Sequence, residues 1–130
     1  MASGIDQQRL SLLLAVLEKR AGLNLVGDDV YINIAGGMTI DEPAADLSVV
    51  AAVASSVRNR AVSPSTALCG EVGLSGEIRG IPQAGLRVRE AAQMGFTRIV
   101  LPSANLEGSG DGKIELVGVR TVGEALDELI

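Results

Sequence analysis

Hydrophobic residues recur at helical spacing near the start of the chain. In the stretch DQQRLSLLLAVLEKRAG the apolar positions are three or four residues apart, at Leu10, Leu13, Leu14 and Leu17. This spacing predicts an amphipathic helix. Asp6 is placed to cap its first turn, and Gly22 follows its last residue.

The next segment, DVYINIAGG, alternates instead. Val30, Ile32 and Ile34 point to one side and the residues between them to the other, which predicts a strand that the two glycines end. A second helix is expected over DEPAADLSVVAAVASSVRNR, with Pro43 near its first turn and acidic residues at its positive end. Its many alanines favour a central helix packed closely against a sheet.

The second half of the chain predicts shorter elements. TALCGEVGLSGEIRGI is typical of a hairpin joined around Ser75 and Gly76, and AGLRVREAAQMG of a helix ended by Gly95. TRIVLP and IELVGV are predicted strands separated by the loop SANLEGSGDGK. Thr121 and Glu124 form a capping-box pattern for a last helix.

Helices and strands therefore interleave along the whole chain. We expect an α/β fold, a two-layer sandwich with helices packed on a mixed sheet. The 130 residues fit one domain, residues 1–130, with a single core. The most apolar stretch is interrupted by serines, so a membrane span is not expected. The start MASGIDQQ lacks a secretory signal, which predicts a cytoplasmic protein.

Composition restricts the chemistry. The chain has one cysteine, Cys69, in an apolar run, and no histidine, which excludes the usual zinc sites and a Ser-His-Asp triad. We expect no metal or cofactor in this chain. Cys69 is interpreted as a buried strand residue rather than a nucleophile.

The net charge of −5 argues against broad nucleic-acid binding, but the charges are unevenly distributed. Residues 58–98 hold six arginines against three glutamates, so one part of the surface is a candidate basic patch; scattered solvated charges are the alternative.

The local sequence motifs do not indicate a catalytic site. GSGDGK fails the phosphate-loop pattern at both ends and predicts a flexible surface loop. Glu71 and Glu77 across the hairpin are ordinary surface charges without a pocket. Lys19 and Lys113 are the lysines of the chain, and neither is expected to lie buried beside a serine.

Several separated blocks carry a family resemblance. GIDQQRLSLLLAVLEKRAGLNL, INIAGGMTIDEPAADLSVVAAVASS, GEVGLSGEIRGIPQ and EAAQMGFTRIVLPSAN together resemble the carboxy-terminal domain of the bacterial DNA-repair RadA (Sms) family. That domain is similar to the proteolytic domain of Lon. The resemblance runs from about Gly4 to Leu129 and implies the Lon proteolytic-domain fold.

The resemblance also implies a missing dyad. In active Lon proteases the second helix begins Gly-Pro-Ser-Ala-Gly, with serine as nucleophile, and here Ala44 occupies that place. Ungapped matching puts Gly85 near the dyad lysine, and a small shift puts Arg87 there. Alanine cannot attack, glycine has no side chain, and arginine stays protonated. Asp46 would add negative charge where an oxyanion has to form.

For the longer RadA-type proteins the family implies further parts. These are a four-cysteine zinc finger and a RecA-like ATPase, whose motifs this sequence lacks, so ATP, magnesium and zinc are expected only in those domains. The family implies hexameric rings, ATP-driven DNA branch migration and work with the RecA-type recombination machinery.

The leading hypothesis is therefore a non-catalytic scaffold for ring assembly, with DNA as a further candidate partner. The candidate DNA contacts are Arg79, Arg87 and Arg89, with Arg58 and Arg60 as weaker ones. One alternative is a residual serine peptidase that uses Ser48 or Ser75 with a lysine. The other is a module that only docks proteins.

Overall fold

A computed structural model describes residues 2–3, 6–25, 32–33, 42–110 and 112–130. Its helices are α1 (Gln7–Arg20), α2 (Asp46–Arg58), α3 (Ala84–Gln93) and α4 (Val122–Leu129), with 3₁₀ turns η2 (Pro43–Ala45) and η3 (Ser103–Asn105). Its strands are β1 (Ala2–Ser3), β2 (Ile32–Asn33), β3 (Thr66–Leu68), β4 (Glu71–Val72), β5 (Ile78–Arg79), β6 (Arg98–Pro102) and β7 (Glu115–Val119). The predicted α/β class is confirmed.

Helix α1 follows the leucine spacing. Its cap is Asp6, whose carboxylate accepts a hydrogen bond from the Gln8 N–H (3.2 Å), and Gly22 follows in the left-handed conformation (φ 72°). Of the four leucines that define the predicted apolar face, Leu10, Leu13 and Leu17 are buried, and Leu14 packs against them at the edge of the core. The predicted first helix is confirmed with its cap.

Three parallel strands form the main sheet, in the order β3-β6-β7. Strand β6 is central, and its residues alternate between the two faces: Val100 belongs to one hydrophobic cluster, and Ile99 and Leu101 to another. Both faces are therefore buried, as is usual for parallel strands.

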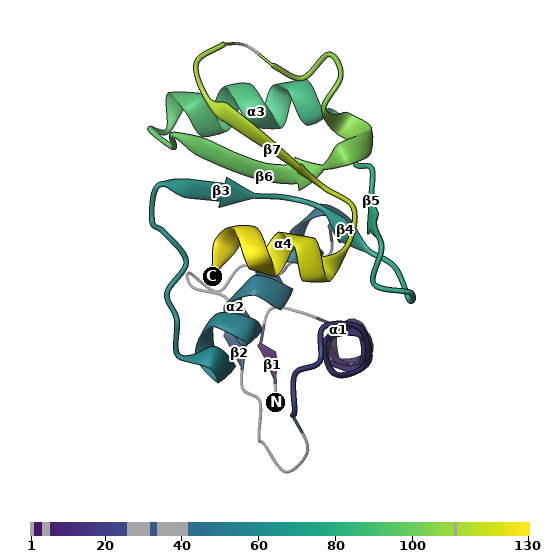
Figure 1. The fold of residues 1–130 in the computed structure, drawn as a ribbon. Coiled ribbons are helices and arrows are strands. Elements are labelled where there is room, and N and C mark those ends of the chain that lie inside the picture. The colour runs from purple at the N-terminus through teal and green to yellow at the C-terminus, as the bar shows by residue number, and fades with distance from the viewer. Residues whose placement is uncertain (1, 4–5, 26–31, 34–41, 111) are drawn as a thin grey trace.

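Helices cover the two faces of this sheet. Figure 1 shows α3 beyond one face and α4 on the other, with α1 and α2 beyond α4. The larger cluster joins α1, α2, α4 and β6, and the smaller one joins α3 to the opposite face. Helix α2 is central, as predicted, but it packs mainly on α1, α4 and β4. The structure thus adds a helical layer to the expected sandwich.

The predicted hairpin is right in one half and wrong in the other. Strands β4 and β5 pair antiparallel around Leu74 and Ser75, and Gly76 takes a positive φ (79°) that favours glycine. Residues Thr66–Leu68, expected in the first arm, instead pair in parallel with β6. The Cys69 N–H still bonds Val100 O (3.0 Å), whereas the Gly70 N–H turns to Ala44 O (2.9 Å).

The strand predicted over residues 30–35 is described only in part. Ile32 and Asn33 form β2, which pairs in parallel with β1. The other positions of that prediction, Val30, Tyr31, Ile34 and Ala35, lie outside the described residues.

Helix ends in the second half agree with the sequence signals. Gly95 follows α3 with a φ of 96°. Thr121 Oγ1 accepts from the Glu124 N–H (3.1 Å), so the first bond of the predicted capping box is confirmed. The Glu124 carboxylate accepts from the Arg120 N–H (2.9 Å), one residue before the expected donor.

The loop after β6 is tied down at Asn105 and Ser109, of which only Ser109 lies in the GSGDGK stretch that the sequence predicted to be a flexible surface loop. Asn105 accepts from the Ile81 N–H (2.8 Å) through Oδ1 and donates to Ile81 O (3.1 Å) through Nδ2. The buried Ser109 hydroxyl donates to Asn105 O. These contacts hold the loop against the segment before α3.

A substitution at Leu47 tests whether this residue stabilises the larger hydrophobic cluster. Its side chain is fully buried at the start of α2, so Leu47→Ala is expected to lower the free energy of unfolding by about 2–5 kcal/mol. Val57→Ala, on the exposed end of the same helix, is the control and should change it by less than about 0.5 kcal/mol. Urea denaturation measures both, and equal losses would contradict the assignment of Leu47 to the core.

Candidate functional site at the start of helix α2

The candidate site is the 3₁₀ turn η2 that leads into α2. Pro43 opens this turn, where its missing N–H costs nothing. Ala44 follows and is only 5% exposed. Its methyl belongs to the smaller hydrophobic cluster, together with Cys69, Ile81 and Ala84. The position matched to the Lon nucleophile is therefore an apolar contact.

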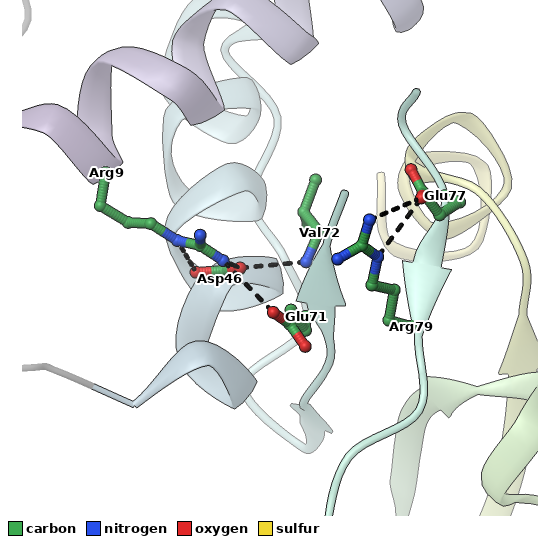
Figure 2. Close-up of polar contacts among 6 residues, drawn as sticks. All are labelled: Arg9, Asp46, Glu71, Val72, Glu77 and Arg79. Carbon is green, nitrogen blue, oxygen red and sulfur yellow. Dashed lines mark hydrogen bonds and ion pairs between the residues drawn. The ribbon is translucent and has the colours of Figure 1, made fainter. Parts of the chain in front are cut away.

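Two residues further on, Asp46 joins three elements. Its carboxylate accepts from Arg9 Nε of α1 (3.0 Å) and from the Val72 N–H of β4 (3.0 Å), and Arg9 Nη2 forms a second bond to it (Figure 2). Asp46 is 4% exposed. The hydrogen bond to Asp46 raises the pKa of Arg9. The negative charge of Asp46, which was expected to oppose an oxyanion, is thus compensated by Arg9, and the carboxylate connects three elements of the fold.

Glu71 adds a weaker contact to this group. Its Oε1 lies 4.0 Å from Arg9 Nη2, and both side chains are about one-third exposed. Asp46, by contrast, has little access to water. Figure 2 shows Arg9 reaching from α1 toward both carboxylates.

Helix α3 brings the matched lysine region to the same cluster. Ala84 packs with Ala44, and Gly85 follows it at the half-buried second position of the helix. Arg87 Nη2 pairs with Glu42, the residue before η2, and Arg87 Nε donates to Pro82 O (3.1 Å). The structure thus brings η2 and α3 together. The side chains that meet there are the Ala44 methyl and a guanidinium held by a carboxylate, whereas a Cβ at Gly85 would lie 4.0 Å from Gly108 O.

Cys69 is buried beside this turn, as the sequence predicted. The sequence predicted that Cys69 is a strand residue, whereas it directly follows the last residue of β3. Burial raises the pKa of its thiol to about 11. At neutral pH Cys69 is therefore protonated and a poor nucleophile.

The serines of the alternative peptidase lie elsewhere. Ser48 is on the exposed side of α2, and its hydroxyl is 3.5 Å from Leu68 O. Ser75 is at the exposed hairpin tip, and its N–H donates to Glu77 Oε1 (3.0 Å). Lys19 is in the last turn of α1, and Lys113 lies beside α3.

Glu71 and Glu77, considered together in the sequence, have different arginine partners. Glu77 pairs with Arg79 on the hairpin (3.2 Å), as Figure 2 shows, whereas Glu71 is near Arg9. Hydrogen bonds from its own N–H, from Arg79 and from the Ser75 N–H lower the pKa of Glu77. An exposed carboxylate of lowered pKa is not suited to act as a general acid.

The candidate DNA arginines do not gather into one patch. Arg79 and Arg87 are paired with acids, and Arg60 donates to Ile130 O (3.3 Å) after α4. Within the described part of the chain, exposed Arg58 and Arg89 have neither a hydrogen bond nor an ion pair. Arg58 ends α2 and Arg89 is on α3, which lie on opposite sides of the sheet (Figure 1).

Two arginines instead hold the end of α4. Arg98 donates to Glu128 O (3.0 Å) and to the Glu128 carboxylate (2.5 Å), and Arg60 reaches the carbonyl of Ile130. Carbonyls at a helix C-terminus lack partners in the helix and attract cations. Part of the arginine excess seen in the sequence therefore serves the fold.

Arg9 is the important residue that the sequence reasoning missed. It precedes Leu10 and lies four residues before Leu13, so it stands at the margin of the apolar face of α1. From this position, the sequence could have predicted that the Arg9 side chain reaches toward the neighbouring elements. Its partner lies 37 residues away, which no local pattern identifies.

Comparison with known proteins agrees with this geometry. The chain belongs to the family of Lon protease (S16) C-terminal proteolytic domains, whose sequence model matches residues 19–124. Within that family it matches the carboxy-terminal Lon-like domain of RadA proteins. It is 51% identical over 127 residues to the DNA repair protein RadA of Bacillus subtilis (strain 168).

Other relatives give the same result. The chain is 48% identical over 128 residues to the DNA repair protein RadA of Halalkalibacterium halodurans and 47% identical over 134 residues to that of Listeria monocytogenes. These matches cover 97–100% of this chain but only 28–29% of the relatives. The family resemblance is confirmed.

In the described residues, no helix is long and apolar enough to cross a membrane.

Cys69 reports whether the Glu42–Arg87 pair holds α3 against η2. We expect a thiol reagent to label folded wild-type Cys69 slowly, because the thiol is buried and protonated. Glu42→Gln should raise the labelling rate by up to about fivefold, since an exposed ion pair contributes up to about 1 kcal/mol. Glu77→Gln removes a carboxylate from another pair and should leave the rate unchanged; equal rates in all three proteins would contradict this role.

Proposed function

We propose that this chain is a non-catalytic Lon-like scaffold domain of a DNA-repair protein of the RadA type. One observation carries the proposal: the buried Ala44 methyl stands at the matched nucleophile position and packs with Ala84 and Cys69. No heteroatom is offered there for acyl transfer. Asp46 supports the same conclusion, because its carboxylate is paired with Arg9 and joins α1, α2 and β4.

The scaffold would act within a longer protein, since the chain spans less than a third of the length of its RadA relatives. We propose that it supports hexameric ring assembly in the cytoplasm during ATP-driven branch migration. ATP, magnesium and zinc would be bound by other domains, and the RecA-type recombination machinery would be met through the whole protein.

DNA contact by this domain is part of the proposal. Exposed Arg58 and Arg89 support it. The pairing of Arg79 and Arg87 with glutamates supports instead a module that docks proteins. A DNA-binding measurement over a salt series distinguishes DNA contact from protein docking. DNA contact through arginines predicts an affinity that falls steeply with salt, whereas protein docking alone predicts no DNA binding.

The absence of peptidase activity is tested by substitution. Wild type and Ala44→Ser are both expected to leave unfolded casein intact, because Ala44→Ser supplies a hydroxyl but no base. Gly85 has no side chain, and Arg87 is paired with Glu42. A serine-reactive probe gives the second readout, with Ser48→Ala as the control that locates any label. Stoichiometric labelling of the wild type would restore the peptidase alternative.

Ring assembly is tested by mass. For a RadA-type protein that carries this domain, light scattering is expected to give the mass of a hexamer over a concentration series. Removal of the domain should shift that mass toward smaller species, because ring contacts are lost. An unchanged hexamer without the domain would contradict the scaffold role and leave the absence of catalysis unaffected.

A further inference from the structure

The tip of the β4–β5 hairpin exposes a large apolar side chain on a well-ordered turn. Leu74 is 70% exposed. Around it, the Gly73 N–H donates to Glu77 O (2.9 Å), and the Gly76 N–H donates to Gly73 O (3.0 Å). The Ser75 N–H donates to Glu77 Oε1 (3.0 Å). A turn held in this way has little conformational freedom to lose when a partner covers Leu74, so the apolar contact is preorganised.

Neighbouring elements brace the same hairpin. Gly76 O accepts from the Val122 N–H at the start of α4 (2.9 Å), and Arg120 O accepts from the Ile78 N–H of β5 (2.8 Å). The end of α1 also lies against the turn, since a Cβ added at Gly76 would be 2.9 Å from Arg20 Cβ. Figure 1 shows the hairpin at the edge of the molecule, beside α1 and α4. Arg20 and Arg120 therefore lie next to the exposed tip.

These two arginines bring unpaired positive charge to the hairpin. Arg20 and Arg120 are exposed, and within the described ranges neither guanidinium has a hydrogen bond or an ion pair. Two carboxylates nearby are already engaged. Glu77 is paired with Arg79 (3.2 Å), and Glu124 accepts from the Arg120 N–H (2.9 Å). The hairpin thus has two available cations, although the chain carries a net charge of −5.

An exposed leucine beside unpaired arginines suits a partner that is both acidic and apolar. A guanidinium binds a carboxylate through two parallel N–H groups. A leucine contributes when a partner removes its surface from water. A phosphate backbone would use Arg20 and Arg120 but would offer Leu74 no apolar contact. The combination therefore favours a protein partner over a nucleic acid.

We propose that a hairpin surface, formed by Leu74, Arg20 and Arg120, docks an acidic protein segment that carries an apolar side chain. The two arginines pair with carboxylates of the segment, and Leu74 packs on its apolar residue. The proposal goes beyond the scaffold role, which needs no such partner. It uses arginines that were not among the candidate contacts in the sequence.

The experiment measures fluorescence anisotropy of labelled peptides with the 130-residue chain. The probe is a short peptide of aspartates that ends in leucine and phenylalanine. In a second peptide both apolar residues are replaced by serine. Leu74→Ser removes the apolar part of the hairpin surface, and Arg20→Gln/Arg120→Gln removes its charge. Glutamine at position 20 keeps a Cβ and a Cγ, the atoms of Arg20 that lie nearest Gly76.

Matched control variants make the same changes elsewhere. Met94→Ser replaces an apolar side chain that is 77% exposed after α3. Arg58→Gln/Arg89→Gln removes two exposed arginines that make no ion pair among the described residues. Circular dichroism checks that each variant keeps the fold.

We expect the wild type to bind the acidic apolar peptide and to bind the serine peptide more weakly. Leu74→Ser and Arg20→Gln/Arg120→Gln should each lower the affinity by at least about fivefold, which corresponds to a loss of about 1 kcal/mol. The double arginine variant should also make the affinity less dependent on salt. Both control variants should bind within about twofold of the wild type.

Three results would overturn the proposal. One is the absence of peptide binding by the wild type, and another is an equal loss of affinity in the hairpin and control variants. The third is peptide binding that Leu74→Ser leaves unchanged and a duplex oligonucleotide displaces, which would assign the arginines to a nucleic-acid backbone. None of these results bears on the scaffold role, which light scattering and the peptidase assay test separately.

Discussion

The fold around the candidate site depends on the buried carboxylate of Asp46. A carboxylate out of water must be paired and hydrogen-bonded, and here one partner comes from α1 and the other from the backbone of β4. The start of α2 is therefore fixed from two sides. Ala44, two residues earlier, is held in the apolar cluster under α3.

This arrangement supports the proposed role of the protease-type domain as a scaffold. The turn before α2 still meets α3 across the same cluster, but its side chains now contribute packing and ion pairs. The buried thiol of Cys69 remains protonated because burial opposes its charge. Among the described residues near the turn, the carboxylates of Glu42 and Asp46 are paired with arginines and the thiol of Cys69 is buried, which supports a structural role for this region.

Local signals explain what the sequence predicted correctly. The leucine spacing and Asp6 cap of α1, and the Thr121 cap of α4, depend on neighbours within four residues. Strand pairing of Thr66–Leu68 does not, because its partner β6 is about thirty residues away, and the hairpin prediction failed there. Ala44 was found through family resemblance. The partners of the arginines are set by tertiary packing and were outside the reach of sequence patterns.

The most direct test of the central claim is a double-mutant cycle between Arg9 and Asp46, measured by urea denaturation. If the start of α2 is a structural joint, Arg9→Ala and Asp46→Ala should couple by about 1–3 kcal/mol, because Asp46 is nearly buried. The Arg9–Glu71 pair, 4.0 Å apart and partly exposed, is the comparison and should couple by less than about 1 kcal/mol. Additive effects of Arg9→Ala and Asp46→Ala, within about 0.5 kcal/mol, would contradict the account.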